Sequence, residues 1–144
     1  KSGVRKVYNY QTTPVWSNAM FPNGDGSPYY SADMNINDTS TAYVGNVRVY
    51  KTTNNGSTWN RMFTAEDAPY SFASSSVVEA IEVCPYNSNI VFAGYSQSST
   101  NKGGLFYTTN AGTDRRLYSC YESSLPSKIN PGKKAALFSA RYSP

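Results

Sequence analysis

Few side chains in this sequence can carry out acid–base or nucleophilic chemistry. The 144 residues contain no histidine, so Ser-His-Asp and Cys-His arrangements and histidine-based metal sites are excluded. The two cysteines are too far apart in the sequence for a zinc motif, and no metal or other cofactor is predicted. Gly24-Asp25-Gly26 lacks the lysine and the following helix of a phosphate-binding loop, and is typical of a surface turn. What remains is carboxylate chemistry.

Two acidic residues, Asp33 and Glu82, stand at equivalent positions in two similar stretches of the chain. Glycoside hydrolysis requires two carboxyl groups flanking the scissile bond, so these two are the catalytic candidates. The structural alternative is that an acid at the start of a strand binds backbone groups or a nearby arginine. Glu66 and Asp67 lie in a loop-like stretch and are expected to be solvated.

Sugar binding asks for less than catalysis, because exposed aromatic faces stack on pyranose rings beside amide and hydroxyl groups. The best candidates for such a surface are Tyr29, Tyr30 and Tyr95. The alternative is that most aromatic side chains in polar stretches belong to the core. The aromatic residues in loop-like, polar stretches are Trp16, Tyr29, Tyr30, Tyr70, Phe72 and Tyr95.

An internal repeat organises the elements that must position these residues. Residues 32–45 align with 81–94, 49 positions later, and residues 49–57 align with 105–113, 56 positions later. The seven extra residues fall in the polar stretch 95–104, as expected of a lengthened hairpin loop. Each copy predicts an inner strand (32–37 or 77–84), a second (41–45 or 90–95), a third (47–53 or 104–109) and a fourth after the glycine. Four short strands recurring every 50 or so residues are typical of a propeller blade.

Composition supports an all-β fold of one domain. Charged residues amount to 15% of the chain, whereas Ser, Thr, Asn and Gly are abundant and there are 13 tyrosines. The net charge of +4 is concentrated in residues 121–144, which hold four basic side chains and one acid, so nucleic-acid binding is not predicted. No run of 18 apolar residues exists, and no membrane span is predicted.

Three features favour an extracellular protein. Glycosylation sequons begin at Asn37 and Asn55, and the composition is rich in Tyr, Asn and Ser. Cys84 and Cys120 are candidates for one disulfide, with a buried free Cys84 as the alternative.

The segment Thr52-x-Asn54-x-Gly56-x-Thr58-Trp59 resembles the Asp-box, or BNR repeat, with asparagine in place of aspartate. A second, partial copy is Thr108-x-Asn110-x-Gly112, followed by Asp114 and Arg115 where Thr and Trp are expected. Glycine at the turn adopts positive φ, the asparagine binds turn backbone groups, and the tryptophan is expected to bury its ring between adjacent sheets. The resemblance implies that the box residues are structural.

The resemblance covers residues 32–113 and points to Asp-box β-propellers, most closely the secreted bacterial, xyloglucanase-like and sortilin-like group. It implies two four-stranded blades that belong to a larger propeller or to one completed by oligomerisation, because two blades do not close a ring. The arginines lack the spacing of the sialidase triad, so no catalytic residue is carried over.

The sequence therefore predicts an N-terminal strand and loop segment (1–31), a first blade (32–64), a second blade (76–119) and a basic C-terminal segment (120–144). Residues 1–31 are expected to supply a strand that staples the ring or a neighbour. The leading function is a non-catalytic extracellular module that binds glycan or protein, with further blades from the same or another chain. The alternatives are a fragment of a propeller glycoside hydrolase, xyloglucanase-like or sialidase-like, and a structural scaffold.

Overall fold

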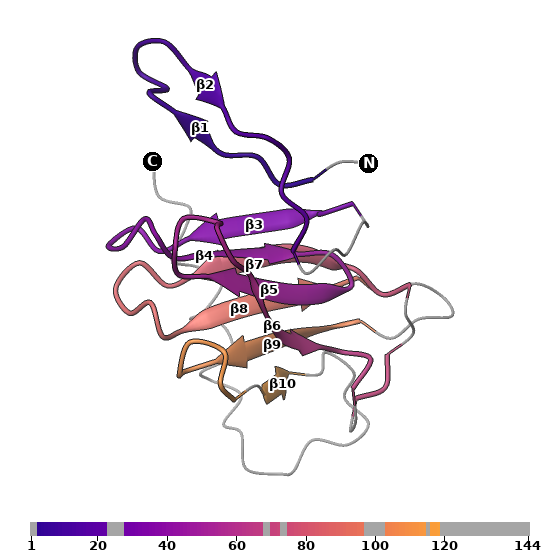
Figure 1. Cartoon of the computed structure of the whole chain (residues 1–144). Coiled ribbons are helices and arrows are strands. Elements are labelled where there is room, and N and C mark those ends of the chain that lie inside the picture. The colour runs from indigo at the N-terminus through magenta and orange to yellow at the C-terminus, as the bar shows by residue number, and fades with distance from the viewer. Residues whose placement is uncertain are drawn as a thin grey trace, which may run out of the picture.

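Short runs of Val, Tyr, Phe and Thr between clusters of Asn, Gly and Ser form antiparallel strands in the computed structural model (Figure 1). The structure describes residues 3–22, 28–67, 70–72, 75–96 and 103–114, and the backbone of 116–118. Within these residues there is no α-helix, which confirms the all-β prediction. The predicted segment 120–144 lies outside the described residues.

The chain builds two four-stranded sheets, each a meander in which consecutive strands pair. The first sheet runs in the order β3 (Ser31–Met34), β4 (Ala42–Gly45), β5 (Arg48–Thr52) and β6 (Asn60–Thr64). The second sheet is formed by β7 (Val78–Val83), β8 (Val91–Tyr95), β9 (Gly104–Thr108) and β10 (Arg116–Tyr118). The first three strands of each sheet overlap their predicted ranges, the fourth follows the glycine as predicted, and the described sheets do not close into a ring.

The two sheets pack face to face, with β3 and β4 against β7. We call the face of the first sheet that meets the second its forward face, and the opposite face its back face. Repeat-equivalent positions define the same two faces in the second sheet. The interface is therefore the forward face of the first sheet on the back face of the second, and its buried members include Tyr43, Val49, Phe63, Val78, Ile81, Val83, Val91, Ala93, Tyr95 and Phe106.

Phe106 is the centre of this interface and is fully buried. Its ring lies 5.2 Å from that of Tyr95, 5.5 Å from Phe63 and 4.9 Å from Tyr70, measured between centroids. Edge-to-face packing of this kind adds to the free energy gained from burial of the rings. The aromatic cluster fixes how the two sheets sit together.

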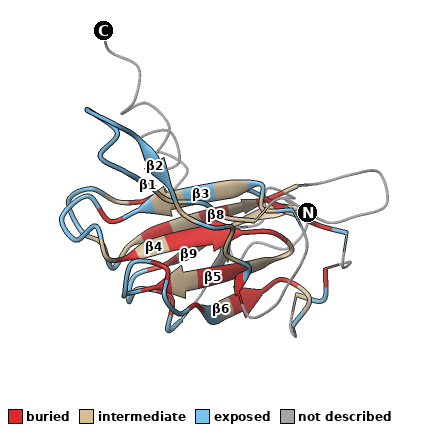
Figure 2. Cartoon of the chain, turned by 45° about the horizontal axis from the view of Figure 1, so that its top comes forward, coloured by how far each residue is buried: buried red, intermediate tan, exposed pale blue. Residues whose placement is uncertain are grey.

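The N-terminal segment forms a separate two-stranded hairpin, β1 (Val7–Tyr8) with β2 (Val15–Trp16), that projects from the sheets (Figure 1). A bridge between Val4 and Met20 continues the pairing toward its base. The described residues 3–22 therefore pair with each other and add no strand to either four-stranded sheet. Figure 2 shows exposed residues gathered in this hairpin and buried residues along β4, β5 and β9.

The base of the hairpin region covers part of the back face of the first sheet. Trp59, 9% exposed, forms a second buried cluster there with Val44 and Tyr50, and Val4 packs against it. Trp59 was expected to bury its ring between adjacent sheets; among the described residues its ring is buried on the face that points away from the second sheet. The cause is tertiary, because the N-terminal segment supplies the apolar cover for that face.

Candidate functional site

The turn after β5 is held by two side chains that bind its backbone. The Thr52 Oγ1 accepts from the Gly56 N–H at 2.9 Å, and the Asn54 Oδ1 accepts from the Thr58 N–H at 2.9 Å. The Asn54 Nδ2 donates to Thr58 Oγ1 at 2.8 Å, and the Thr52 hydroxyl donates to Asn54 Oδ1 at 3.0 Å. These amide and hydroxyl side chains form hydrogen bonds with the turn, where the backbone hydrogen bonds between paired strands stop.

The turn after β9 repeats this network. The Thr108 Oγ1 accepts from the Gly112 N–H at 3.0 Å, and the Asn110 Oδ1 accepts from the Asp114 N–H at 2.8 Å. The carboxylate of Asp114 takes the place of the Thr58 hydroxyl, since its Oδ2 accepts from Asn110 Nδ2 at 2.9 Å. The sequence comparison treated Asp114 as a departure from the motif, whereas an acceptor at this position is what the turn requires.

Both turns need glycine at the same point. Gly56 and Gly112 have φ of +84° and +96°, a region that residues with a Cβ rarely adopt. The preceding residues, Asn55 and Ala111, are also left-handed, with φ of 60° and 57°. The box residues are therefore placed as parts of two structurally equivalent turns.

Asp33 binds backbone amides of both sheets. Its Oδ2 accepts from the Val83 N–H at 2.7 Å, and its Oδ1 accepts from the Met34 N–H at 2.9 Å. The carboxylate thus bridges the inner strands β3 and β7, as the structural alternative for this acid anticipated. Glu82, its repeat equivalent, is half-buried on β7. Nothing in this arrangement holds a second carboxyl group opposite Asp33 across a described cleft.

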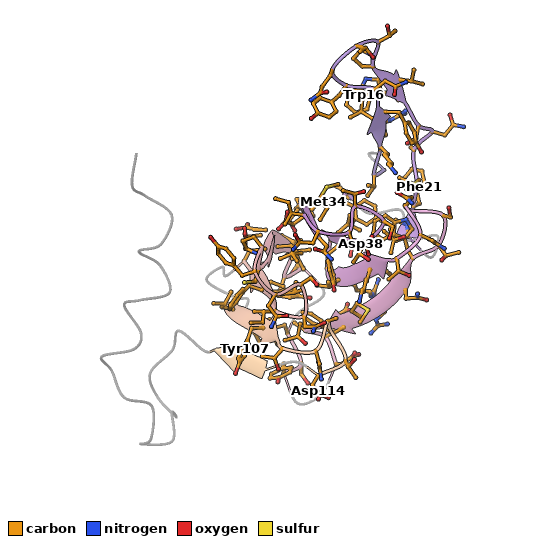
Figure 3. The ribbon with its side chains drawn as sticks, turned by 90° about the vertical axis from the view of Figure 1, so that its left-hand side faces the viewer. Trp16, Phe21, Met34, Asp38, Tyr107 and Asp114 are labelled. Carbon is orange, nitrogen blue, oxygen red and sulfur yellow. The ribbon has the colours of Figure 1, made fainter. Side chains whose placement is uncertain are left out.

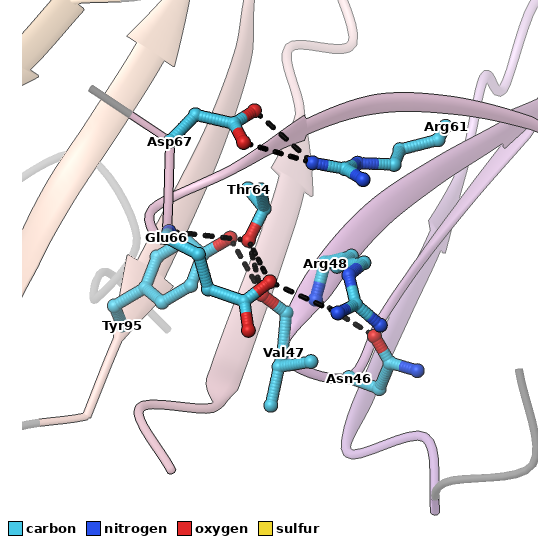
Figure 4. A network of polar contacts seen from close by, with 8 residues as sticks. All are labelled: Asn46, Val47, Arg48, Arg61, Thr64, Glu66, Asp67 and Tyr95. Carbon is cyan, nitrogen blue, oxygen red and sulfur yellow. Dashed lines mark hydrogen bonds and ion pairs between the residues drawn. The ribbon is translucent and has the colours of Figure 1, made fainter. Parts of the chain in front are cut away.

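Glu66 and Asp67 form ion pairs rather than standing free in solvent (Figure 4). Glu66 Oε2 lies 3.1 Å from Arg48 Nη2 and accepts from the Thr64 hydroxyl at 3.1 Å. Asp67 accepts two bonds from Arg61 Nη2, at 3.0 and 3.1 Å. Asp67 is exposed, as expected, whereas Glu66 is half-buried; both acids pair with arginines of β5 and β6 because the turn after β6 brings them back to those strands.

The same network reaches the second sheet. The Tyr95 hydroxyl donates to the Val47 carbonyl at 3.3 Å, and the Thr64 hydroxyl donates to the same oxygen at 3.2 Å (Figure 4). Asn46 is fully buried, and its carbonyl accepts from the Val78 N–H at 2.6 Å. These contacts link the ends of the two sheets, so the network is structural.

The aromatic candidates for sugar binding separate into buried and exposed groups. Tyr95 and Phe72 are 6% and 7% exposed, and Tyr95 packs against Phe106, so it offers no free ring face to a ligand. Tyr29 is half-buried against the Trp59 cluster, whereas Tyr30 is 52% exposed. Placing Tyr95 at a sugar site from its position before the inserted loop therefore failed, because β8 points its side chain into the interface.

Three exposed rings lie instead on the projecting hairpin. Tyr10 is 69% exposed and Trp16 64%, and Tyr8 is 47% exposed with the Lys6 ammonium 5.0 Å from its ring centre (Figure 3). The side-chain amide of Gln11 donates to the Tyr10 hydroxyl at 3.1 Å. The hairpin thus presents aromatic faces beside amide groups. The sequence pattern pointed to Trp16 but not to Tyr8 and Tyr10, because a strand that staples the ring or a neighbour was expected there.

A groove of about 400 Å³ lies between the base of the hairpin and the back face of the first sheet. Its sheet wall includes Ala32, Met34, Ala42 and Val44, and Asn55 and Trp59 also line it. The Lys6 Nζ donates to Asn55 Oδ1 at 2.7 Å across it. The buried Nε1 of Trp59 has no hydrogen-bond partner among the described residues.

The pKa values of Asp38 and Tyr43 are shifted by their local surroundings. Burial raises the pKa of Tyr43 to about 12. The hydroxyls of Ser40 and Thr41 and the Ser40 amide hold the pKa of Asp38 below its usual value, because they bind the ionised carboxylate. Asp38 shapes the exposed turn between β3 and β4, whereas Tyr43 lies in the interface.

The described residues offer little else for chemistry. They contain no cluster of three or more His, Cys, Asp or Glu side chains suited to a metal ion. None of their helical segments is long and apolar enough to cross a membrane. Cys84 is half-buried, and its candidate partner Cys120 lies outside the described residues, so the disulfide stays a prediction.

Comparison of the chain with protein-family models and with curated protein sequences found no match.

Proposed function

We propose that this chain is an extracellular, non-catalytic β-propeller module of the Asp-box type that binds glycan through its N-terminal hairpin. The blade interpretation is supported by two side-by-side meanders that carry the same turn network after their third strands. Further blades from the same or another chain complete the ring in this proposal.

The observation that carries the binding function is the exposure of Tyr10 and Trp16 on a hairpin that stands clear of the sheets. Sugar rings bind by laying their C–H faces on such aromatic side chains, while amides such as those of Asn9 and Gln11 bind hydroxyls. Tyr30 is the second exposed candidate. A two-stranded hairpin of this size is also marginal by itself, which suits a segment that gains order from a ligand.

The glycoside hydrolase alternative is less well supported, because Asp33 is engaged by two backbone amides. A general acid or nucleophile must instead reach the substrate. The scaffold alternative accounts for the sheets but leaves the exposed aromatic hairpin without a role.

The test is calorimetric titration of the full chain with a panel of soluble oligosaccharides, including xyloglucan fragments. Trp16→Ala is expected to weaken binding about tenfold, the size of one aromatic contact of about 1.4 kcal/mol. Tyr86→Ala is the matched control, because Tyr86 is 96% exposed but lies in the turn after β7. Equal binding by Trp16→Ala and the unmodified chain would exclude the hairpin as the site. Release of reducing sugar that is lost in Asp33→Asn would favour the hydrolase.

A further inference from the structure

The forward faces of the two sheets carry matching residues. Tyr43 corresponds to Phe92, Asp33 to Glu82, and the glycines Gly45 and Gly94 correspond to each other. The remaining equivalent pairs on these faces are Ser31 with Ala80, Val49 with Leu105, and Lys51 with Tyr107. The first sheet uses its forward face to bind the second sheet. The second sheet therefore carries an equivalent surface on its own forward face, which points away from the first sheet.

That surface makes defined contacts where it is covered. The Ser31 hydroxyl donates to the Val78 carbonyl at 2.9 Å, and Asp33 accepts from the Val83 N–H at 2.7 Å. The Tyr43 hydroxyl and the Lys51 ammonium both lie 3.4 Å from the Ala111 carbonyl of the second turn. Each contact links the forward face of one sheet to the back face or turn of the next.

Glycine marks the closest approach in this interface. A Cβ on Gly45 would lie 2.6 Å from the Cβ of Val78, so any side chain there would collide with the second sheet. Among the described residues, a Cβ on Gly94 would meet only Ala80 of its own sheet, at 3.7 Å. Glycine within a strand commonly marks a close approach of another backbone. At Gly94 no described strand makes that approach.

The matching receptor surface lies on the back face of the first sheet. Ala32, Met34, Ala42, Val44 and Asn55 line the groove, and their repeat equivalents receive the first sheet. Those equivalents are, in order, Ile81, Val83, Val91, Ala93 and Ala111.

We propose that the forward face of the second sheet of one copy docks in the groove on the first sheet of another copy, head to tail. In this contact Phe92 and Tyr107 enter the groove near Asn55, as Tyr43 and Lys51 approach Ala111 within one chain. Glu82 approaches the groove wall that carries Arg5 and Lys6, which are opposite in charge to Glu82. The exposed Lys6–Asn55 bond gives way as the hairpin moves aside to admit the incoming sheet.

Such a contact joins two different surfaces, the forward face of the second sheet and the groove on the first. Any open assembly of copies would therefore have an unused forward face at one end and an unused groove at the other. It therefore either closes into a ring or propagates. The proposal deepens the function proposed above, since it names a second copy of this chain as the source of further blades. It does not involve the aromatic tip of the hairpin, so the two are separable.

The experiment is sedimentation equilibrium of the full chain from 1 to 200 µM, with one variant for each surface. Gly94→Lys alters the forward face where a side chain meets no other strand, and Met34→Glu alters the groove at a residue that is 50% exposed. We expect the unmodified chain to associate and each variant to be monomeric. We expect an equimolar mixture of the two to form a 1:1 dimer and nothing larger, because only one intact pair of surfaces remains. Tyr86→Ser is the surface control and should associate normally.

Circular dichroism and urea unfolding of each variant confirm that it is folded before its mass is interpreted; Phe92→Glu replaces Gly94→Lys if the latter unfolds. A monomeric unmodified chain at 200 µM would overturn the proposal, and would mean that this chain's own remaining residues or another protein covers the face. Association unchanged in both variants, or a mixture that stays monomeric, would overturn it as well. Glycan binding that persists in a monomeric chain would leave the proposed function standing.

Discussion

The two sheets have the same strand order and the same turn network, yet they differ in how they are covered. β4 of the first sheet has three consecutive buried residues, Tyr43 to Gly45, because the second sheet lies on one side and the N-terminal segment on the other. β8 of the second sheet alternates buried and half-buried residues, since its forward face meets no described sheet. Equivalent sequences thus occupy unequal environments, and the difference separates local from tertiary effects.

The largest expected difference between the two sheets is the loss of stability when a large aromatic side chain is removed from each. Phe106→Ala is expected to lower the free energy of unfolding by about 3–5 kcal/mol, because the residue is fully buried among four other rings. Phe92→Ala, on the half-buried forward face, should cost about 1 kcal/mol. Urea unfolding at low protein concentration measures both. Equal losses would show that the forward face is as buried as the interface.

The next largest difference in stability is expected at the two equivalent glycines, Gly45 and Gly94. Gly45→Ala is expected to destabilise the chain by roughly 2–3 kcal/mol, because the new Cβ collides with Val78. Gly94→Ala should be neutral or stabilise by a few tenths of a kcal/mol, since the site is open and alanine loses less backbone entropy than glycine. The thermal unfolding midpoints of dilute samples distinguish the two. A large loss in Gly94→Ala would contradict an open forward face.

The turns, by contrast, should respond equally. Thr52→Val and Thr108→Val keep the shape of the side chain but remove the oxygen that binds the glycine amide at 2.9 and 3.0 Å. Each is expected to cost about 1–2 kcal/mol, because a buried N–H then lacks a partner. Urea unfolding of both variants is the measurement, with Thr53→Val as the control in the first turn. Losses that differ by more than 1 kcal/mol would show that the turns are not equivalent.

The smallest expected effect is a dependence on pH that Tyr43 has and Phe92 lacks. Burial raises the pKa of Tyr43 from 10.0 to about 12, so the folded state holds this proton more tightly than the unfolded state. Its contribution is fully present below pH 10 and is lost as the pH rises from 10 to 12. Relative to Tyr43→Phe, the unmodified chain should lose about 1 kcal/mol between pH 9 and 11. A constant difference across this range would mean that Tyr43 reaches solvent.

The candidate site could be predicted only in part from the sequence. The position of Trp59 in the turn was clear, but its neighbours were not, because Val4 and Met20 reach it from far along the chain. Tyr95 precedes a polar loop and therefore resembled an exposed residue. The pleat of β8 directs its ring into the aromatic cluster, and this depends on the register with β9.

The sequence by itself determined the short-range features of this protein: the all-β composition, the placement of the strands, and the turns in which Thr52 and Thr108 bind glycine amides. These depend on backbone preferences and on hydrogen bonds between residues a few positions apart. Tertiary structure alone decided that Asp33 joins two sheets, that Glu66 and Asp67 pair with arginines, and which aromatic rings are exposed. Those outcomes depend on which distant face covers each residue, and a repeat that makes two sheets alike in sequence does not specify what lies against each of them.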